Sequence, residues 1–306
     1  MRELAYQLVD VFTDVPFGGN QLAVFTEPPV DLPGTMMQSI ARELNLSETV
    51  FVLPPADKAN HYRLRIFTPG AELLFAGHPT IGTGFVLQQQ GMISPGDVLR
   101  LEEGVGLIEV TLTHEPGNKL LVTMQQPIPQ FGLIYEDRQN LAASLSLMPD
   151  DLLADFPAQV VTSGNPFLFV PIKTLEAIQR IRVRLDLYQA IVAAVGVNGV
   201  YPFTTEVEQA SSSAHSRLFA SHVGISEDPA TGSAAGPLGA YLLHYGLVDA
   251  TAAQHMICEQ GFEMKRPSIL HIHIEGSSEQ ITSVRVGGYT QAMGSGVLNL
   301  TRILSS

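Results

Sequence analysis

Short apolar runs dominate the chain, and most of them are typical of β-strands. β-branched and aromatic residues are frequent in these runs, and turn-forming residues separate them. The first half of the chain has such runs at residues 4–12, 21–25, 49–54, 62–67, 98–103, 107–115 and 119–127. The second half has them at residues 159–172, 199–205, 216–221, 269–276, 283–288 and 297–304. Gly104-Val105-Gly106 separates two of the runs and predicts a hairpin there.

Helical patterns are fewer, and they are more apolar than those of ordinary surface helices. Residues 36–45 carry apolar side chains at helical spacing, and residues 174–195 predict two helical pieces. Residues 78–91 and 228–246 each have a proline near the start and a glycine at the end, which are typical helix boundaries. The pattern therefore predicts an α+β protein in which two apolar helices are buried.

Two stretches of the chain resemble each other. Arg65-Ile-Phe-Thr precedes Ala76-Gly-His-Pro-Thr, and Arg217-Leu-Phe-Ala precedes Glu227-Asp-Pro-Ala-Thr. Arg65 lies 15 positions before Thr80, and Arg217 lies 14 positions before Thr231. Each copy predicts a strand, a loop and a helix start, so we expect two related domains with many strands around one helix. Pro127-Ile128-Pro129 is the strongest candidate for the linker between them.

Composition narrows the class of protein. The 306 residues are enough for about two domains, and 45% hydrophobic with 15% charged residues excludes a disordered chain. The net charge of −13 argues against nucleic-acid binding. The start of the chain has no signal-peptide pattern and no run is long enough for a membrane helix, so we expect a cytoplasmic protein that binds no membrane.

The two apolar helices begin with residues that suit anion binding. Gly77-His78-Pro79-Thr80 and Thr231-Gly232-Ser233 would expose backbone N–H groups at a helix start, where the helix dipole favours negative charge. These starts would hold a small carboxylate. The alternative is a pair of ordinary capped helices, which the residues alone favour slightly.

Three ionisable residues are candidates for proton transfer. Glu48 precedes an apolar strand, where desolvation would suit it to acid–base chemistry, and His78 lies at a helix start. Asp228 precedes Pro229 and would orient His78 or the substrate. Each residue has a local alternative: hydrogen bonding at a helix–strand joint for Glu48, and helix capping for His78 and Asp228.

Metal and cofactor chemistry has little support. His271 and His273 share one strand face, but no acidic or cysteine partner lies at matching spacing, so we interpret them as a solvent-facing pair. Nucleotide-binding glycine motifs and the G-x-S-x-G elbow are absent from the sequence. Cys258 is the single cysteine, and we interpret it as a small buried group.

Taken in order along the chain, several segments resemble the PhzF-like (phenazine biosynthesis-like) isomerase family. The most specific pair is AGHPT at residues 76–80 and EDPATGSAAG at residues 227–236. The others are GGNQLAVF (18–25), LNLSETVFVLP (44–54), EQGFEMKRPS (259–268) and VRVGGYTQAMGSGVL (284–298). This chain reads GNQ where many relatives read GNP or GNS.

The resemblance implies the diaminopimelate epimerase-like fold, with two similar domains and an active site in the cleft between them. Each domain would be a barrel-like mixed or antiparallel sheet around a central helix. We expect one domain at residues 1–118 with 284–306 and the other at residues 119–283. The family works without a cofactor or metal, and its relatives suggest a homodimer.

The resemblance also assigns roles to residues. It implies that Glu48 is the acid/base group and that His78 and Asp228 assist proton transfer. Asn20, Gly77, Gly232 and Ser233 would bind a small cyclic or aromatic-like carboxylate substrate. The expected reaction moves a proton within that substrate.

Two alternatives stay open at this point. A racemase or epimerase on the same fold would use a cysteine at each helix start, whereas this chain has Gly77 and Asp228-Pro229-Ala230 there. A non-catalytic carboxylate-binding protein would keep the fold without the chemistry.

Overall fold

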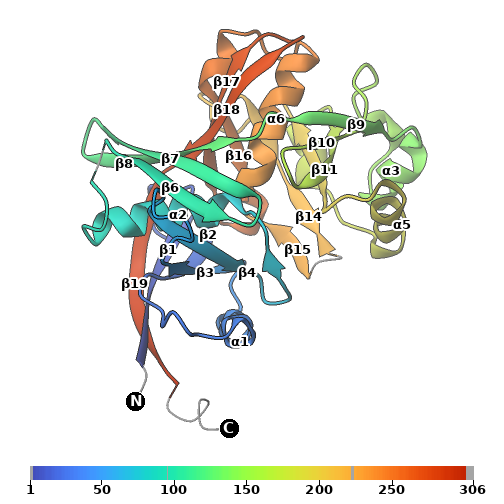
Figure 1. Cartoon of the computed structure of the whole chain (residues 1–306). Coiled ribbons are helices and arrows are strands. Elements are labelled where there is room, and N and C mark those ends of the chain that lie inside the picture. Colours follow the sequence, from blue (N-terminus) through green and yellow to red (C-terminus); the bar gives the residue numbers. More distant parts are fainter. Residues whose placement is uncertain (1–2, 95, 222–223, 301–306) are drawn as a thin grey trace. The chain divides into compact units, whose positions relative to one another are not determined.

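The computed structural model describes residues 3–94, 96–221 and 224–300, and it forms two compact units (Figure 1). The first unit consists of Met1–Met124 and Gly287–Ser306, and the second of Gln125–Val286. Strand β8 (Lys119–Gln126) pairs with β7 (Gly106–Glu115), so its first residues belong with the strands that precede it. Residues 301–304 of the last predicted strand lie outside the described residues.

The first unit is built on a sheet with both parallel and antiparallel pairs. β1 (Glu3–Val11) pairs with β19 (Thr290–Asn299) and with β2 (Asn20–Phe25), both antiparallel. β2 runs parallel to β3 (Glu48–Leu53), which is antiparallel to β4 (Tyr62–Phe67).

The remaining strands of this unit continue from β4. β5 (Glu72–Leu73) pairs antiparallel with β4, and β6 (Val98–Glu103) runs parallel to it. β6 and β7 form the predicted hairpin, with Glu103 opposite Gly106.

Helix α2 (Gly77–Gln89) is the centre of the first unit. It packs against β1, β2, β3, β7 and β19, and Figure 1 shows it among these strands. Residues 77–87 of the helix are all buried, which explains why no polar face was visible in the sequence. A Cβ atom on Gly82 would lie 2.6 Å from Leu22 Cδ2, so glycine lets the helix approach the sheet closely.

Helix α1 (Gly34–Leu44) covers the other side of β3 and β4 and has an ordinary amphipathic pattern. Met37, Ile40 and Ala41 are buried against aromatic side chains. Among these, the rings of Phe25 and Phe51 stack with centroids 4.8 Å apart. The helix ends at Asn45, whose left-handed backbone (φ 51°) turns the chain toward β3.

The second unit contains its own mixed set of strands. β9 (Gln130–Ile134), β10 (Gln159–Thr162) and β11 (Pro166–Pro171) pair antiparallel, and β11 runs parallel to β12 (Val200–Thr204). The expected strand over residues 159–172 is thus two strands separated by a turn.

The rest of the second unit leads to its buried helix. β12 pairs with β13 (Ala214–Ser216) and β14 (Leu218–Ala220), which in turn pair with β16 (Met256–Gln260) and β15 (Ile225–Asp228). β17 (Ser268–Gly276) follows β16, and β18 (Ile281–Gly288) ends the unit. Helix α6 (Gly232–His244) packs against β17 and β10 and is buried over residues 232–243.

Shorter helices complete the second unit. α3 (Arg138–Ser144), α4 (Leu175–Gln179) and α5 (Leu185–Val195) share a separate apolar core with β10–β12. α4 and α5 confirm the prediction of two helical pieces in residues 174–195. Single turns of 3₁₀ helix occur at Pro149–Asp151, Ala252–His255 and Phe262–Met264.

No helix in the described part of the chain combines the length and apolar character needed to cross a membrane.

Candidate active site

Local backbone geometry in the first unit brings Glu48 and Asn20 to neighbouring strands. Glu48 is the first residue of β3 and pairs with Leu22 of β2, and Asn20 is the first residue of β2. Gly19 precedes Asn20 with φ +63°, and a Cβ there would lie 2.3 Å from Val11 O. Only glycine fits this turn, and the turn fixes where Asn20 begins its strand.

His78 joins these two residues from the start of α2. Its Nδ1 lies 2.8 Å from Glu48 Oε2 and 3.2 Å from Asn20 Nδ2. All three side chains are buried, with exposures of 8% for Glu48, 3% for His78 and 0% for Asn20. The structure therefore brings together three of the residues that the sequence singled out.

The imidazole can make only one of its two Nδ1 contacts as a hydrogen bond at a time. Nδ1 carries either a proton, which lies toward Glu48, or a lone pair, which accepts from Asn20. At 2.8 Å the Glu48 contact is an ion-pair distance, but Oε2 has no partner with hydrogen-bond geometry among the described residues. Oε2 thus keeps acceptor capacity for a proton that comes from a bound molecule.

The start of α2 itself offers donors. Its N-cap is Ala76, which has no side chain that can cap, and its first turn contains no acidic residue. The N-cap side chain therefore makes no bond to the first N–H groups of the helix, and the positive end of the helix dipole lies beside the Glu48–His78 pair.

Glu103 is a buried acid beneath this helix start that the sequence analysis did not select. Thr80 Oγ1 lies 2.6 Å from Glu103 Oε1 and 2.8 Å from Ala76 O. Burial raises the pKa of Glu103 to about 8, although hydrogen bonds from Thr80 and Ala76 oppose the rise. A signal existed, because Leu99, Leu101 and Glu103 alternate on the buried face of β6.

The second unit has a corresponding set of polar residues around α6. Asp228, Thr231 and Ser233 are each at most 8% exposed. Thr231 is the N-cap of α6 but makes no capping hydrogen bond, and its Oγ1 donates instead to Asp228 Oδ2 at 2.5 Å. Gly232 and Ser233 open the helix, whose first turn contains no acidic residue.

Asp228 is not the N-cap that its position in the sequence indicated. It is the last residue of β15, and the helix begins at Gly232 rather than at residue 228. The physical reason is strand pairing: Asp228 lies opposite Leu218 of β14, and three further residues separate it from the first residue of the helix. The Asp228 carboxylate still serves the helix start, because it accepts the Thr231 hydroxyl.

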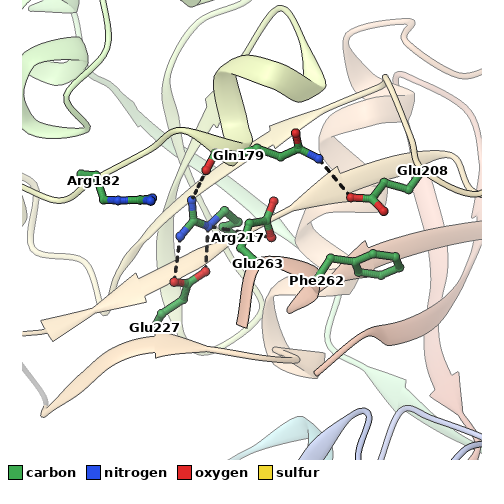
Figure 2. Close-up of a pocket in the computed structure, with 7 residues that line it drawn as sticks. All are labelled: Gln179, Arg182, Glu208, Arg217, Glu227, Phe262 and Glu263. Carbon is green, nitrogen blue, oxygen red and sulfur yellow. Dashed lines mark hydrogen bonds and ion pairs between the residues drawn. The ribbon is translucent and has the colours of Figure 1, made fainter. Parts of the chain in front are cut away.

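A buried ion pair fixes the strand that carries Asp228. Arg217 donates from Nε and Nη2 to both oxygens of Glu227, at 2.7 and 2.8 Å, and is 5% exposed. Figure 2 shows this pair in a cavity of about 610 Å³, with Glu263 and the Gln179 carbonyl beside the guanidinium. Because Glu227 precedes Asp228, the pair holds the end of β15 in place.

The other candidates of the sequence analysis do not form a site. Cys258 is fully buried, and burial raises its pKa to about 11 despite hydrogen bonds with Ser216 and Tyr201. His273 contacts Gln254 O and Glu275. In residues 3–94, 96–221 and 224–300 no group of three or more metal-binding side chains occurs.

Comparison with known proteins agrees with these features. Residues 9–296 match the family model of phenazine biosynthesis-like proteins. The chain is 35% identical over 300 residues to trans-2,3-dihydro-3-hydroxyanthranilate isomerase of Pseudomonas fluorescens, covering 96% of this chain and 99% of the relative. It is 32% identical to an uncharacterized isomerase of Mesorhizobium japonicum, covering 97% and 99%.

Solved structures are also similar to this chain in their backbone fold. A PhzF-family protein from Bacillus anthracis is 26% identical with a TM-score of 0.89, covering 98% of this chain and all of that one. A hydroxyproline epimerase from Agrobacterium vitis shares the mixed α/β fold, with a TM-score of 0.67 at 14% identity and coverage of 98% and 93%. The chain therefore belongs to the phenazine biosynthesis-like (PhzF) family of isomerases.

Proposed function

We propose that the protein is a cofactor-independent isomerase that moves a proton within a small cyclic carboxylate, with Glu48 as the acid/base group. The observation that carries this proposal is the buried contact of Glu48 with His78 and Asn20 beside an uncapped helix start. A carboxylate needs a partly desolvated place and a retained lone pair to take a proton from carbon, and Glu48 has both.

The proposed reaction uses one base twice. The Glu48 carboxylate removes a proton from a carbon next to the substrate's π system, and the electron pair of that C–H bond delocalises into the ring. The protonated Glu48, whose proton can exchange with solvent, then delivers a proton to another carbon, and its carboxylate is regenerated. While Glu48 is ionised, a proton on Nδ1 of His78 lies toward it and stabilises its charge.

The substrate's anion needs its own partners. We propose that the N–H groups of Gly77 and Gly232 and the hydroxyl of Ser233 bind the carboxylate. Asp228 would orient a polar substituent of the same molecule. That the protein forms a homodimer stays a prediction, and its mass in solution, measured by light scattering, tests it.

The likeness to trans-2,3-dihydro-3-hydroxyanthranilate isomerase supplies the first substrate to test. The fold alone does not choose a substrate, so related cyclic carboxylates belong in the same screen. Thiol-based racemisation gains no support, because Cys258 is buried and its thiol stays protonated up to a pH near its pKa of about 11.

The experiment that tests the base is Glu48→Gln, which keeps the shape and removes the proton acceptor. We expect deuterium uptake from heavy water into the substrate to fall at least about 10²-fold, since general bases contribute roughly 10²–10⁴-fold. Glu109→Gln is the control, because the Glu109 side chain is 52% exposed on β7. Uptake by Glu48→Gln at the parent rate would overturn the proposal.

A further inference from the structure

Gln260 is a fully buried amide at the end of β16 that makes four hydrogen bonds, three of them with Asp228 and Thr231 just before α6. Its Nε2 donates to Asp228 O at 2.8 Å and to Thr231 Oγ1 at 2.9 Å. Its Oε1 accepts from Thr231 N and from Tyr201 OH, both at 3.1 Å. Two donors and two acceptor sites are satisfied at once, which only an amide side chain achieves here.

These contacts fix the direction of the Thr231 hydroxyl. A hydroxyl has one proton, and Thr231 Oγ1 receives a hydrogen bond from Gln260. Its own proton is therefore free to point at Asp228 Oδ2, 2.5 Å away. The donors run in one order, from the Gln260 amide through the Thr231 hydroxyl to the Asp228 carboxylate, and each bond polarises the next.

We propose that Gln260 is a positioning residue of the isomerase, which acts through Thr231 to hold the Asp228 carboxylate and the first N–H groups of α6 in their working orientation. This inference rests on the proposed function, because it needs Asp228 to meet the substrate. Gln260 does not touch the substrate in this proposal. It makes bonds with the backbone on both sides of Pro229, at Asp228 O and Thr231 N.

The first unit contains a comparable arrangement of a strand-end side chain and a threonine beside α2. The parallel pairs Arg63–Glu102 and His215–Glu259 place Glu103 and Gln260 at matching ends of β6 and β16. Glu103 contacts Thr80 as Gln260 contacts Thr231. Three positions before the threonine, however, the first unit has Gly77 and the second has Asp228. In the first unit Thr80 therefore lies between the Glu103 carboxyl and the Ala76 carbonyl, whereas in the second unit Thr231 lies between the Gln260 amide and the Asp228 carboxylate.

Among the described residues that hydrogen-bond to Gln260, Asp228 is the one with a carboxylate. Burial holds the pKa of Tyr201 well above its usual value, and it raises that of Cys258 to about 11, so both are neutral near pH 7. The Glu259 carboxylate is turned to His215 and to the backbone of Glu208 and Gln209. A second carboxylate at position 260 would therefore compete directly with Asp228 for the Thr231 proton.

The first test removes only the connecting hydroxyl. We expect Thr231→Val to lower kcat for the isomerisation about 10²-fold with KM little changed, because small misplacements of catalytic groups cost about that much. Thr231→Ser restores the hydroxyl and is expected to recover most of kcat. Thr83→Val is the matched control, since Thr83 is buried and its Oγ1 has no hydrogen-bond partner within the described residues.

The second test changes the amide into an acid. Gln260→Glu is expected to keep more activity at low pH, where the new carboxyl is protonated and still donates one hydrogen bond. Its kcat falls as pH rises and the acid ionises, whereas Gln125→Glu on the exposed part of β8 keeps the parent pH profile. A merely structural change would lower kcat by the same factor at every pH.

Amide hydrogen exchange tests the role of Gln260 independently of the proposed catalytic function. Thr231 N–H loses its acceptor in Gln260→Leu, so its exchange should accelerate at least about tenfold whether or not any substrate is turned over. Parent kcat in Thr231→Val, while Glu48→Gln is inactive, would overturn the positioning role and leave the proposed function standing. Unaltered exchange at Thr231 would overturn it even if the parent enzyme proves inactive on every substrate tried.

Discussion

At the residue scale, the buried carboxyl of Glu103 links the stability of the first unit to pH. Its pKa in an unfolded chain is 4.5, and burial raises it to about 8 in the folded protein, against the opposing bonds from Thr80 and Ala76. The folded state therefore binds the proton more tightly, so stability is fully present below pH 4.5 and is lost as pH rises toward 8. The neighbouring Glu102 does not share this behaviour, because bonds from Asn60 and from two backbone N–H groups lower its pKa.

We predict that Glu103→Gln removes this loss, since the amide keeps a neutral hydrogen-bonding group in the same place. Between about pH 5 and 8 the free energy of unfolding of the parent protein should fall more steeply than that of the variant. Urea denaturation at several pH values measures both slopes. Parallel curves would show that Glu103 is already ionised in the folded protein at pH 5. The cavity that Glu103 helps to line has four other charged residues, and the variant leaves them unchanged: Arg63, Arg65, Glu72 and Glu102.

Residues also show where sequence reasoning was sufficient and where it was not. Glu48 and His78 were selected for their places at a strand start and a helix start, and the structure brings them together. Glu103 and Gln260 were missed, although each is the polar member of a buried strand face that is otherwise apolar. Asking which polar residue interrupts the inward face of a strand would have found both, because such a residue must find partners.

At the element scale, each unit contains a two-pronged Arg–Glu ion pair, here called the strand clamp, and the two pairs differ in burial. Arg65 makes a two-pronged pair with Glu72 at 2.7 Å and lies 5.2 Å from the ring centre of Phe67. Arg217 makes the same pair with Glu227 and lies 4.9 Å from Phe219. The side-chain exposures are 29% and 41% in the first pair but 5% and 17% in the second. Arg217 also donates to the carbonyls of α4 and its neighbours at Ile178 and Ile181.

We predict that Arg217→Ala destabilises the protein by about 3–5 kcal/mol, because it leaves the Glu227 carboxylate, which is only 17% exposed, without its cation. The matched Arg65→Ala should cost only about 0–1 kcal/mol, the range for solvent-exposed pairs. Urea unfolding of both variants at pH 7 makes the comparison. Equal costs would show that burial does not decide the strength of this clamp.

Helices and strands with a clear hydrophobic pattern were predicted from the sequence. Short elements, and a strand defined by its pairing with another strand, were not. The four predicted helical regions all contain helix, and β3, β4 and β6 lie where the apolar runs indicated. The short strands β5, β15 and β16 and helix α3 were missed, since two to seven residues give little periodicity. β9 was also missed, because its Leu133 and Ile134 are exposed and its pairing with β10 defines it.

At the scale of the whole molecule, an acidic protein with a buried histidine–carboxylate cluster should have two sources of alkaline instability besides Glu103. The chain carries a net charge of −13 at pH 7, so self-repulsion grows as further groups lose protons. The second source is local: His215 is fully buried between Glu259 and Glu263, at 2.9 and 3.0 Å. Burial lowers the pKa of this imidazole, but the two carboxylates outweigh burial and raise it to about 9.

The sign of the local effect follows from that pKa. His215 titrates at 6.5 when unfolded and at about 9 when folded, so its contribution is full below pH 6.5 and disappears as pH rises through 9. Loss of its proton leaves two buried carboxylates facing a neutral ring. The Glu259 carboxylate also accepts the backbone N–H groups of Glu208 and Gln209, so the effect reaches beyond one side chain.

Salt distinguishes the two sources. We predict that the free energy of unfolding at pH 10 is lower than at pH 7, and that about 0.5 M NaCl restores only part of the difference. Repulsion between exposed charges is screened at that ionic strength, whereas the buried cluster is screened much less. An NMR titration of the His215 ring gives its pKa directly and should report a value near 9. If salt restored the whole difference and the ring titrated near 6.5, the carboxylates would not hold a charged imidazole, and net charge alone would set the alkaline limit.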